Sequence, residues 1–488
     1  MPVGRQCLFA RFARWLGILN LMTHMRLVAL FLVPLLGAPL VAVAQDTGGS
    51  YFEFLLARRL EGVGDFAAAQ AALERAAKLD ARSSEVRAEL GAFHLRRSQP
   101  EEAEAAAKSA LAIDDTSVEG HRVLGLVYAG YADGGSQKGS TAQVTQYLKD
   151  AITHLEQASA SMPGDLILNF TLGRLYLRAG TPEKAVQALT RVVAQNPGSV
   201  QARLLLAQAQ AVTQDVAAAI ATLDAIVDDE PRVAAALGQY QEQAGQLREA
   251  AESYTKALAV APMSRELKSR RITALYNAKE YKAAAAFATD ARRQHPEDAR
   301  FPRLQGRALF DAGDRSGGVA VMEEAAKTFP KDTPTLYALA DIYRDADRGA
   351  DAERALRQVL VLEPTNPNAL NYLGYLLAMR GDKLDEAVQL VRKALEAEPD
   401  NGAYLDSLGW AHFKRGDLAE AEKYLGAAAQ RMPQNSEVQD HLGDVFSRSG
   451  RVDEAIAAWN KALSGDGEDV DLEAVRRKID DARAKGRR

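Results

Sequence analysis

Prolines recur along this chain with a period of 34 residues. Pro163, Pro197 and Pro231 are spaced in this way. The same spacing joins Pro262, Pro296, Pro330 and Pro364, and later Pro399 and Pro433. A fixed period of this length indicates a tandem array of one supersecondary unit, which buries its apolar face only against its neighbours. An array also suits a chain of 488 residues, which is longer than one compact core usually allows.

Small residues recur in phase with these prolines. A Leu-Gly pair ends at residues 91, 125, 173, 238, 374, 409 and 443, and in five of these cases an alanine follows the glycine by twelve residues. Ala421 after Gly409 is one example, and a turn signal such as "KRGDLAEA" lies between the two positions. The pattern predicts a helical hairpin in which the glycine of the first helix lets the second helix approach closely at the alanine.

This order of Leu-Gly, Gly, Ala, Ala and Pro resembles the tetratricopeptide repeat (TPR). The resemblance implies an all-α fold, a right-handed α-solenoid superhelix of about twelve hairpins followed by a C-terminal capping helix. We assign repeats 1–6 to residues 50–264, weaker repeats 7–8 to 265–332, repeats 9–12 to 333–469, and the capping helix with a basic tail to 470–488. Arg271 and Gly318 replace expected Leu and Ala in the weaker pair, so local distortion is expected there.

Repeat 3 departs from the period through an insertion near residues 131–145. Its order is Lys138-Gly139-Ser140, whereas a phosphate-binding loop has Gly-Lys-Ser, and no strand is expected before it. We therefore predict a turn followed by a longer second helix that begins near Thr141, and the role of the insertion stays open.

The first 44 residues read as an export signal. Arg26 precedes an apolar run from Leu27, and Ala42-Val43-Ala44 gives a small-residue cleavage pattern before Gln45. We expect Met25 to be the true start, cleavage after Ala44, a short linker at 45–49, and a periplasmic or otherwise exported protein peripheral to the outer membrane. The alternative is a retained membrane anchor, since Leu27 to Ala44 is close to the length of a span.

Charge and motifs exclude several classes of function. The formal net charge is −5, and residues 1–44 hold four arginines and no acid, so the exported part is more acidic still and no nucleic-acid surface is expected. The sole cysteine is Cys7, and no two histidines have the spacing of a zinc helix. Nucleophile and nucleotide motifs are also absent from the sequence. We expect no catalytic residue, no metal and no cofactor.

The resemblance implies that helix positions 2, 5, 9 and 12 line a concave groove. In repeats 10–12 these positions give a first candidate surface for a basic peptide, with an aromatic centre and acidic flanks. His412 takes a packing position instead. The alternative is that Trp410 packs against Tyr375 and stiffens the array; in the binding interpretation, Trp410→Ala leaves folding almost unchanged. The first candidate surface consists of Asn371, Tyr375, Asp406, Trp410, Phe413, Asp440 and Asp444.

A second candidate surface lies in repeats 8 and 9 and is rich in arginine. It suits an acidic segment or a C-terminal carboxylate, and the alternative is a solvated charged face. It consists of Arg300, Arg303, Arg307, Tyr337, Asp341 and Arg344.

Residues 367–463 are similar to the C-terminal repeats of bacterial periplasmic or outer-membrane-associated TPR proteins. That resemblance implies a non-catalytic exported adaptor that binds proteins or peptides and delivers substrates to a carboxyl-terminal processing protease. A structural scaffold for outer-membrane or polysaccharide assembly and export is the alternative. The expected partner is a protein, either such a protease or an envelope assembly complex. No direct membrane span is expected after signal cleavage.

Overall fold

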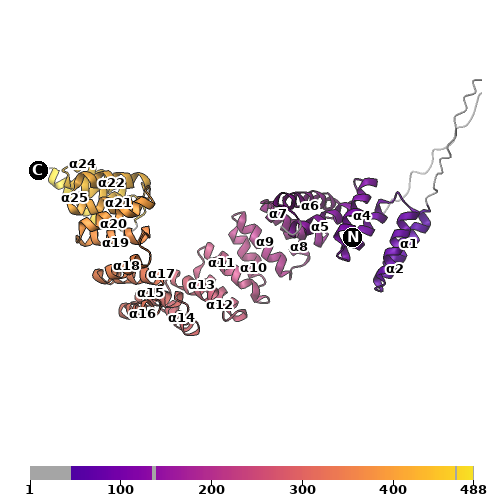
Figure 1. Ribbon diagram of the computed structural model, residues 1–488, viewed down its shortest axis with the longest axis horizontal. Coiled ribbons are helices and arrows are strands. Elements are labelled where there is room, and N and C mark those ends of the chain that lie inside the picture. Colours follow the sequence, from indigo (N-terminus) through magenta and orange to yellow (C-terminus); the bar gives the residue numbers. More distant parts are fainter. Residues whose placement is uncertain (1–45, 135–138, 468–469, 487–488) are drawn as a thin grey trace, which may run out of the picture. The chain divides into compact units, whose positions relative to one another are not determined.

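The chain folds as helical pairs. A computed structural model describes residues 46–134, 139–467 and 470–486, and in these ranges it contains helices α1 to α25, one short 3-10 helix and no strand. Figure 1 shows the helices, and the two helices of each pair pack as an antiparallel hairpin. The predicted all-α repeat fold of about twelve hairpins and a capping helix is confirmed.

Each pair has a first and a second helix. The first helices are α1 (Thr47–Gly62), α3 (Ser84–Arg96), α5 (Val118–Asp133), α7 (Leu166–Arg178), α9 (Val200–Val212), α11 (Ala234–Gln243), α13 (Arg265–Asn277), α15 (Arg300–Asp311), α17 (Thr333–Asp345), α19 (Pro367–Arg380), α21 (Gly402–Arg415) and α23 (Ser436–Arg448). The second helices are α2 (Phe66–Leu79), α4 (Pro100–Ile113), α6 (Thr141–Ser161), α8 (Pro182–Gln195), α10 (Val216–Asp224), α12 (Leu247–Val260), α14 (Tyr281–Gln294), α16 (Arg315–Thr328), α18 (Gly349–Leu362), α20 (Leu384–Ala397), α22 (Leu418–Arg431) and α24 (Val452–Leu463). The last helix is α25 (Leu472–Gly486).

The turn inside most pairs carries one left-handed residue, and these residues repeat with the proline period. Gly416 (φ 88°) and Gly450 (φ 77°) are 34 residues apart, and glycine suits this conformation because it has no Cβ. Ser98, Gln214, Lys279 and Asp347 take the same conformation at equivalent turns. The turn geometry is therefore common to the repeats even where glycine is missing.

Close approach inside a pair occurs where the Leu-Gly pattern predicts it. A Cβ added to Gly409 would lie 2.6 Å from Leu425 Cγ, 2.9 Å from the Leu425 amide nitrogen and 3.2 Å from the Ala421 carbonyl oxygen. Gly91 meets the Ala103 carbonyl in the same way, at 3.2 Å. Because backbone atoms cannot move aside as a flexible side chain does, the glycine sets the helix spacing.

Residues 46–83 form one compact unit, which holds α1 and α2. The buried Ser50 hydroxyl donates to the Ala76 carbonyl at 3.0 Å, and Arg75 pairs with Glu53 at 2.8 Å. Helix α1 begins at Thr47, inside the expected linker at 45–49, because the Asp46 carboxylate accepts from the Gly49 amide and caps the first turn. The predicted linker is therefore shorter than expected. The predicted export signal at residues 1–44 lies outside the described residues.

The second unit begins at Ser84 and holds the remaining helices. Its irregular step lies between α10 and α11, where α10 has nine residues and the 3-10 turn Pro231–Val233 precedes α11. The shortened proline interval from Pro231 to Pro262 begins at this step. Repeats 7 and 8, in which distortion was expected, form complete helices α13 to α16. Gly318 allows this, since a Cβ there would lie 2.6 Å from the Gly306 carbonyl oxygen.

The third pair contains the long second helix that the sequence predicts. Helix α6 begins at Thr141 and has 21 residues, and Ser140 and Gln143 close a capping box at its start. Residues 135–138 of the insertion lie outside the described residues. Within the described part of the chain, no helix has the length and apolar character needed to cross a membrane.

Candidate functional site

In the second unit, first helices contact one another in three stretches, which run from α3 to α9, from α13 to α17 and from α19 to α23. Helix α15 contacts α13 and α17, and α21 contacts α19 and α23. Both candidate surfaces predicted from the sequence lie on these helices, so each can be judged by the exposure and the partners of its side chains.

In the first candidate surface, Asp406 is a buried ion-pairing residue. Its side chain on α21 is 4% exposed, and its two carboxylate oxygens lie 3.0 and 3.2 Å from Nδ1 of His441 on α23. Burial disfavours the charged imidazole, but the attraction of Asp406 outweighs it and raises the pKa of His441. The aspartate therefore joins two repeats and is not presented to a ligand.

Trp410 is also buried. It is 7% exposed, and its ring stacks on His441 with centroids 3.8 Å apart and on Phe413 with centroids 4.9 Å apart. Its indole nitrogen points to Met379 Sδ on α19 at 3.1 Å. The ring thus joins α19, α21 and α23. This packing role is close to the alternative weighed from the sequence, although the stacking partner is His441 and not Tyr375.

Tyr375 and Asn371 on α19 are half-buried. The Tyr375 hydroxyl donates to Glu437 of α23 at 2.6 Å, a link that spans two repeats. Asn371 Oδ1 is buried without a hydrogen-bond partner among the described residues. His412 is fully buried, as its predicted packing position requires, and its Nδ1 lies 3.1 Å from Asp417.

The acidic flank of this surface is occupied by the last helix. Lys478 of α25 lies 2.8 Å from Asp440 and 2.7 Å from Asp444 on α23. The Trp459 indole nitrogen donates to Asp444 at 3.2 Å. The first candidate surface therefore has its aromatic centre buried and its two flanking acids paired within the chain.

The second candidate surface contains a pocket. Arg300, Arg303 and Arg307 of α15 line a cavity of about 340 Å³, here called the arginine pocket. The rest of its lining is mainly apolar and comes from α15 and from the two neighbouring first helices. These residues are Ser269 and Tyr276 of α13, Leu304 of α15, and Pro334 and Ala338 of α17. Apolar walls with a few convergent polar groups are typical of ligand sites.

Each of the three arginines is held by a carboxylate. Arg300 pairs with Asp298 at 2.7 Å, Arg303 with Asp332, and Arg307 with Asp311 at 2.8 Å and Asp345 at 2.6 Å. Their side chains stay 38%, 22% and 41% exposed. The guanidinium groups are thus fixed in position and still reach solvent, which lowers the entropy lost when a ligand binds.

Two groups at this pocket have pKa values shifted by their contacts. Burial and the hydrogen bond to Asp311 raise the pKa of the Tyr276 hydroxyl. Burial disfavours the charge on Arg307, but hydrogen bonds to Asp345, Tyr276 and Asp311 outweigh it and raise the pKa of the guanidinium. Both groups therefore keep their ordinary protonation states at neutral pH, and Arg307 stays a cation.

The other three residues of this candidate surface face the next repeat. The Tyr337 hydroxyl donates to Asn366 at 3.0 Å, the Tyr372 hydroxyl donates to Asp341 at 2.7 Å, and the Arg344 guanidinium lies 5.6 Å from the centroid of the Tyr372 ring. None of Tyr337, Asp341 and Arg344 lines the arginine pocket.

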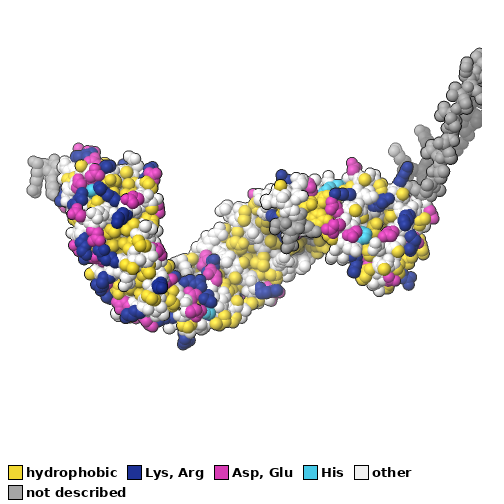
Figure 2. Space-filling view, in the orientation of Figure 1, with side chains coloured by type: hydrophobic (Ala, Val, Ile, Leu, Met, Phe, Trp, Pro, Cys, Tyr) yellow, Lys and Arg dark blue, Asp and Glu magenta, His cyan; other side chains and the backbone are white. Residues whose placement is uncertain are grey.

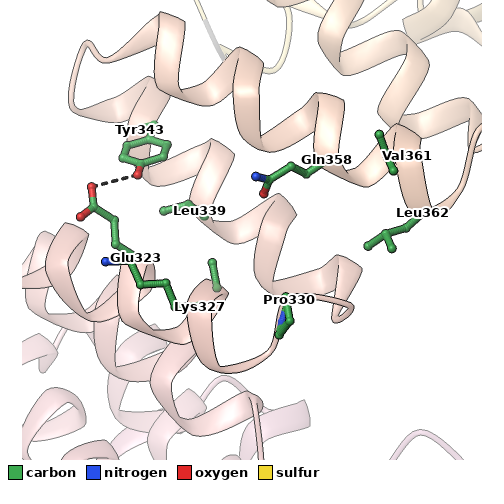
Figure 3. Close-up of a pocket in the computed structure, with 9 residues that line it drawn as sticks. Glu323, Lys327, Pro330, Leu339, Tyr343, Gln358, Val361 and Leu362 are labelled. Carbon is green, nitrogen blue, oxygen red and sulfur yellow. Dashed lines mark hydrogen bonds between the residues drawn. The ribbon is translucent and has the colours of Figure 1, made fainter.

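A second cavity, of about 440 Å³, opens on the second helices α16 and α18 (Figure 3). Leu339 and Tyr343 of α17 lie at its back, and the Tyr343 hydroxyl donates to Glu323 at 2.8 Å. Val361, at its edge, is 79% exposed. Unlike the arginine pocket, this cavity brings together no set of like-charged groups.

The wider surface favours neither sign of charge. Figure 2 shows basic and acidic side chains interspersed over the C-terminal repeats, drawn at the left, and few charges over α9 to α12. In residues 46–134, 139–467 and 470–486, no group of three or more His, Cys, Asp or Glu side chains is arranged to hold a metal ion.

Sequence reasoning missed the residues contributed by neighbouring repeats. His441, Lys478 and Tyr276 each complete a site from the repeat before or after the one considered. A signal for His441 and Tyr276 was available, because side chains of neighbouring first helices contact one another, as His441 does with Asp406 and Tyr276 with Arg307.

Comparisons with known proteins agree with the geometry. Two family models, both described as tetratricopeptide repeat, match this chain, one at residues 170–234, 235–299 and 337–402 and the other at 62–126 and 412–479. TPR repeat-containing protein PA4667 of Pseudomonas aeruginosa is 30% identical over 176 residues, covering 36% of this chain and 30% of that protein. The antiviral innate immune response effector IFIT1 of Macaca fascicularis is 26% identical over 163 residues, covering 32% and 34%. The chain thus spans about a third of each relative.

Solved structures show a weaker likeness. The structure of Naa15/Naa10 bound to HypK-THB has a TM-score of 0.42 and 17% identity, covering 84% of this chain and 68% of that one. Yeast Tom70 has a TM-score of 0.42 and 12% identity, covering 90% and 96%.

Proposed function

Because the chain belongs to the tetratricopeptide repeat family, whose members bind protein partners, we propose that it is a non-catalytic adaptor whose binding site is the arginine pocket. The observation that carries this proposal is the combination of three fixed, partly exposed arginines with an apolar floor on one set of first helices. The first candidate surface offers no comparable opening, since Asp406 and Trp410 are buried.

The chemistry of the pocket defines the segment that it fits. Leu304, Pro334 and Ala338 accept an apolar side chain, and the arginines on α15 favour an adjacent acidic group or a C-terminal carboxylate. Because Arg300, Arg303 and Arg307 already hold carboxylates, an incoming acid shares these cations and adds specificity more than affinity.

The test uses one substitution in each cavity. Ala338→Glu places a carboxylate in the arginine pocket, and Val361→Glu places one at the exposed edge of the cavity on α16 and α18. We expect a pull-down with the full chain to lose its partner with Ala338→Glu and to keep it with Val361→Glu, while both variants keep the helical circular dichroism of the wild type. Loss of the partner with Val361→Glu alone would instead assign binding to the second helices.

The location and class of partner are part of the same proposal. We propose that residues 1–44 direct export and that the partner is a periplasmic protease of the carboxyl-terminal processing class, as the similarity at residues 367–463 implies. Cell fractionation and N-terminal sequencing test export: a periplasmic chain that begins at Gln45 supports it, and a cytoplasmic chain contradicts it.

A structural scaffold for envelope assembly is the second candidate function. The cavity on α16 and α18 favours it, because a scaffold needs a second partner surface. A scaffold is expected to capture assembly or export proteins that depend on Val361 and not on Ala338, whereas an adaptor captures a protease that depends on Ala338.

A further inference from the structure

The last helix rests on a surface with a defined chemistry. Val475 and Ile479 of α25 are buried against Ala455, Trp459 and Ala462 of α24. We call the surface beneath α25, formed by α23 and α24, the α25 seat. Its floor is apolar, and Asp440 and Asp444 form its acidic edge.

Lys478 pairs with both carboxylates at the acidic edge of the seat. Its ammonium group donates to both oxygens of Asp440, at 2.9 and 2.8 Å, and to Asp444 at 2.8 Å. The two carboxylates are one helical turn apart and only 15% and 19% exposed. Two like charges in this position are unfavourable without a cation between them, so the seat requires a basic side chain at this point.

Helix α25 has few packing partners among the helices. The helix packs chiefly against α24, and Lys478 forms its ion pairs with α23. Its outer face carries the exposed side chains Glu473, Arg476, Arg477, Asp480, Asp481 and Arg483. By contrast, α23 packs against α21, α22 and α24. A helix with few buried contacts opens at a lower free-energy cost than one packed on several sides.

We propose that the α25 seat is a binding site for an amphipathic helix of another protein, and that α25 occupies it until such a helix displaces it. The spacing of Val475, Lys478 and Ile479 defines the partner: a helix with apolar residues at positions i and i+4 and a lysine at i+3. The charge complementarity between this lysine and the pair Asp440 and Asp444 selects the occupant. This site is separate from the arginine pocket and does not depend on it.

A labelled peptide of residues 470–486 serves as the probe. In the full chain, Val475→Asp with Ile479→Asp removes the apolar contacts of α25 and opens the seat. We expect the peptide to bind this variant at least about tenfold more tightly than the wild type, because an occupied seat lowers the apparent affinity by the fraction that is free. Adding Asp440→Asn with Asp444→Asn is expected to abolish binding, and so is Lys478→Glu in the peptide.

Two results would overturn the proposal. The first is that the peptide binds the wild type and the opened variant equally well, or that it still binds the opened variant after Asp440→Asn and Asp444→Asn are added. The second comes from hydrogen exchange of the opened variant and of full-chain Lys478→Glu. If both variants lose protection throughout α23 and α24, α25 is an obligatory part of the fold and not a displaceable occupant.

Discussion

Asp406 of α21 and His441 of α23 form a buried ion pair between neighbouring repeats, with 3.0 Å between the carboxylate and Nδ1. Trp410 covers the imidazole, and Glu437 lies 4.0 Å from its other nitrogen. Asp406, Trp410 and His441 therefore form one packed cluster. His441 belongs to the next repeat, and the cluster holds the two repeats together.

This pair makes stability depend on pH. Attraction by Asp406 overcomes the effect of burial and raises the pKa of His441 above its unfolded value of about 6.5. The contribution of the ion pair to the free energy of unfolding is thus complete below pH 6.5, and it is lost as pH rises through the pKa of His441 in the folded state. Denaturation from pH 6 to 9 is expected to show a falling free energy of unfolding, and Asp406→Asn is expected to flatten this part of the profile. An unchanged slope in Asp406→Asn would assign the pH dependence to another group.

Trp410→Ala is expected to destabilise the fold. The ring is 7% exposed and stacks on two neighbours, so its removal leaves a cavity that costs about 3 to 5 kcal/mol. The sequence-based expectation of nearly unchanged folding assumed an exposed ring. Val361→Ala, at a side chain that is 79% exposed, is the control and should change stability by less than about 0.5 kcal/mol. Urea melts of equal midpoint for the two variants would contradict the packing role.

Two glycines in one hairpin should respond in opposite ways to alanine. At Gly409 the new Cβ meets the Leu425 amide nitrogen at 2.9 Å, so Gly409→Ala forces the helices apart at a cost of about 1 to 3 kcal/mol. Gly426 in α22 has no heavy atom within 4 Å of such a Cβ, so Gly426→Ala should stabilise the helix by about 0.5 to 1 kcal/mol. Thermal melts that rank the variants the other way would contradict the predicted close approach.

Glu353 should make the C-terminal repeats sensitive to acid. Its side chain is 10% exposed and pairs with Arg357 and Arg380 of α18 and α19 and with Lys383 beside α20. Burial favours the neutral acid, but hydrogen bonds to Lys383, Arg357 and Arg380 outweigh it and lower the pKa to about 2. The stabilisation is present above the unfolded pKa of about 4.3 and is lost as pH falls towards 2.

The matched variant for this prediction is Glu353→Gln. This variant is expected to have a lower free energy of unfolding at pH 7. It is also expected to lose less of that free energy than the wild type does between pH 5 and 2. Acid titrations followed by circular dichroism check both effects, and coincident acid transitions of Glu353→Gln and wild type would remove Glu353 as their cause.

The periodic part of the fold was predictable because each repeat encodes it locally. The prolines, Gly409 with Ala421, and the helix start at Thr141 follow from spacing within one unit. The partners of the candidate surfaces lie about one repeat away, as His441 does from Asp406 and Lys478 does from Asp440. The position numbers within one helix place Asp406 and Trp410 on the face that turns towards the neighbouring first helices. They do not show that His441 of the next first helix covers both side chains. The irregular step between α10 and α11 was not predicted, although the shortened proline interval begins there, at Pro231.

The most direct test of the account is site-specific photo-crosslinking in the full chain. A photoreactive residue at position 338 lies in the arginine pocket on the first helices, and one at position 361 lies on the second helices. We predict a crosslink to the partner from position 338 that is weakened when Arg307→Ala is added, and none from position 361. A crosslink from position 361 with none from 338 would contradict binding in the arginine pocket.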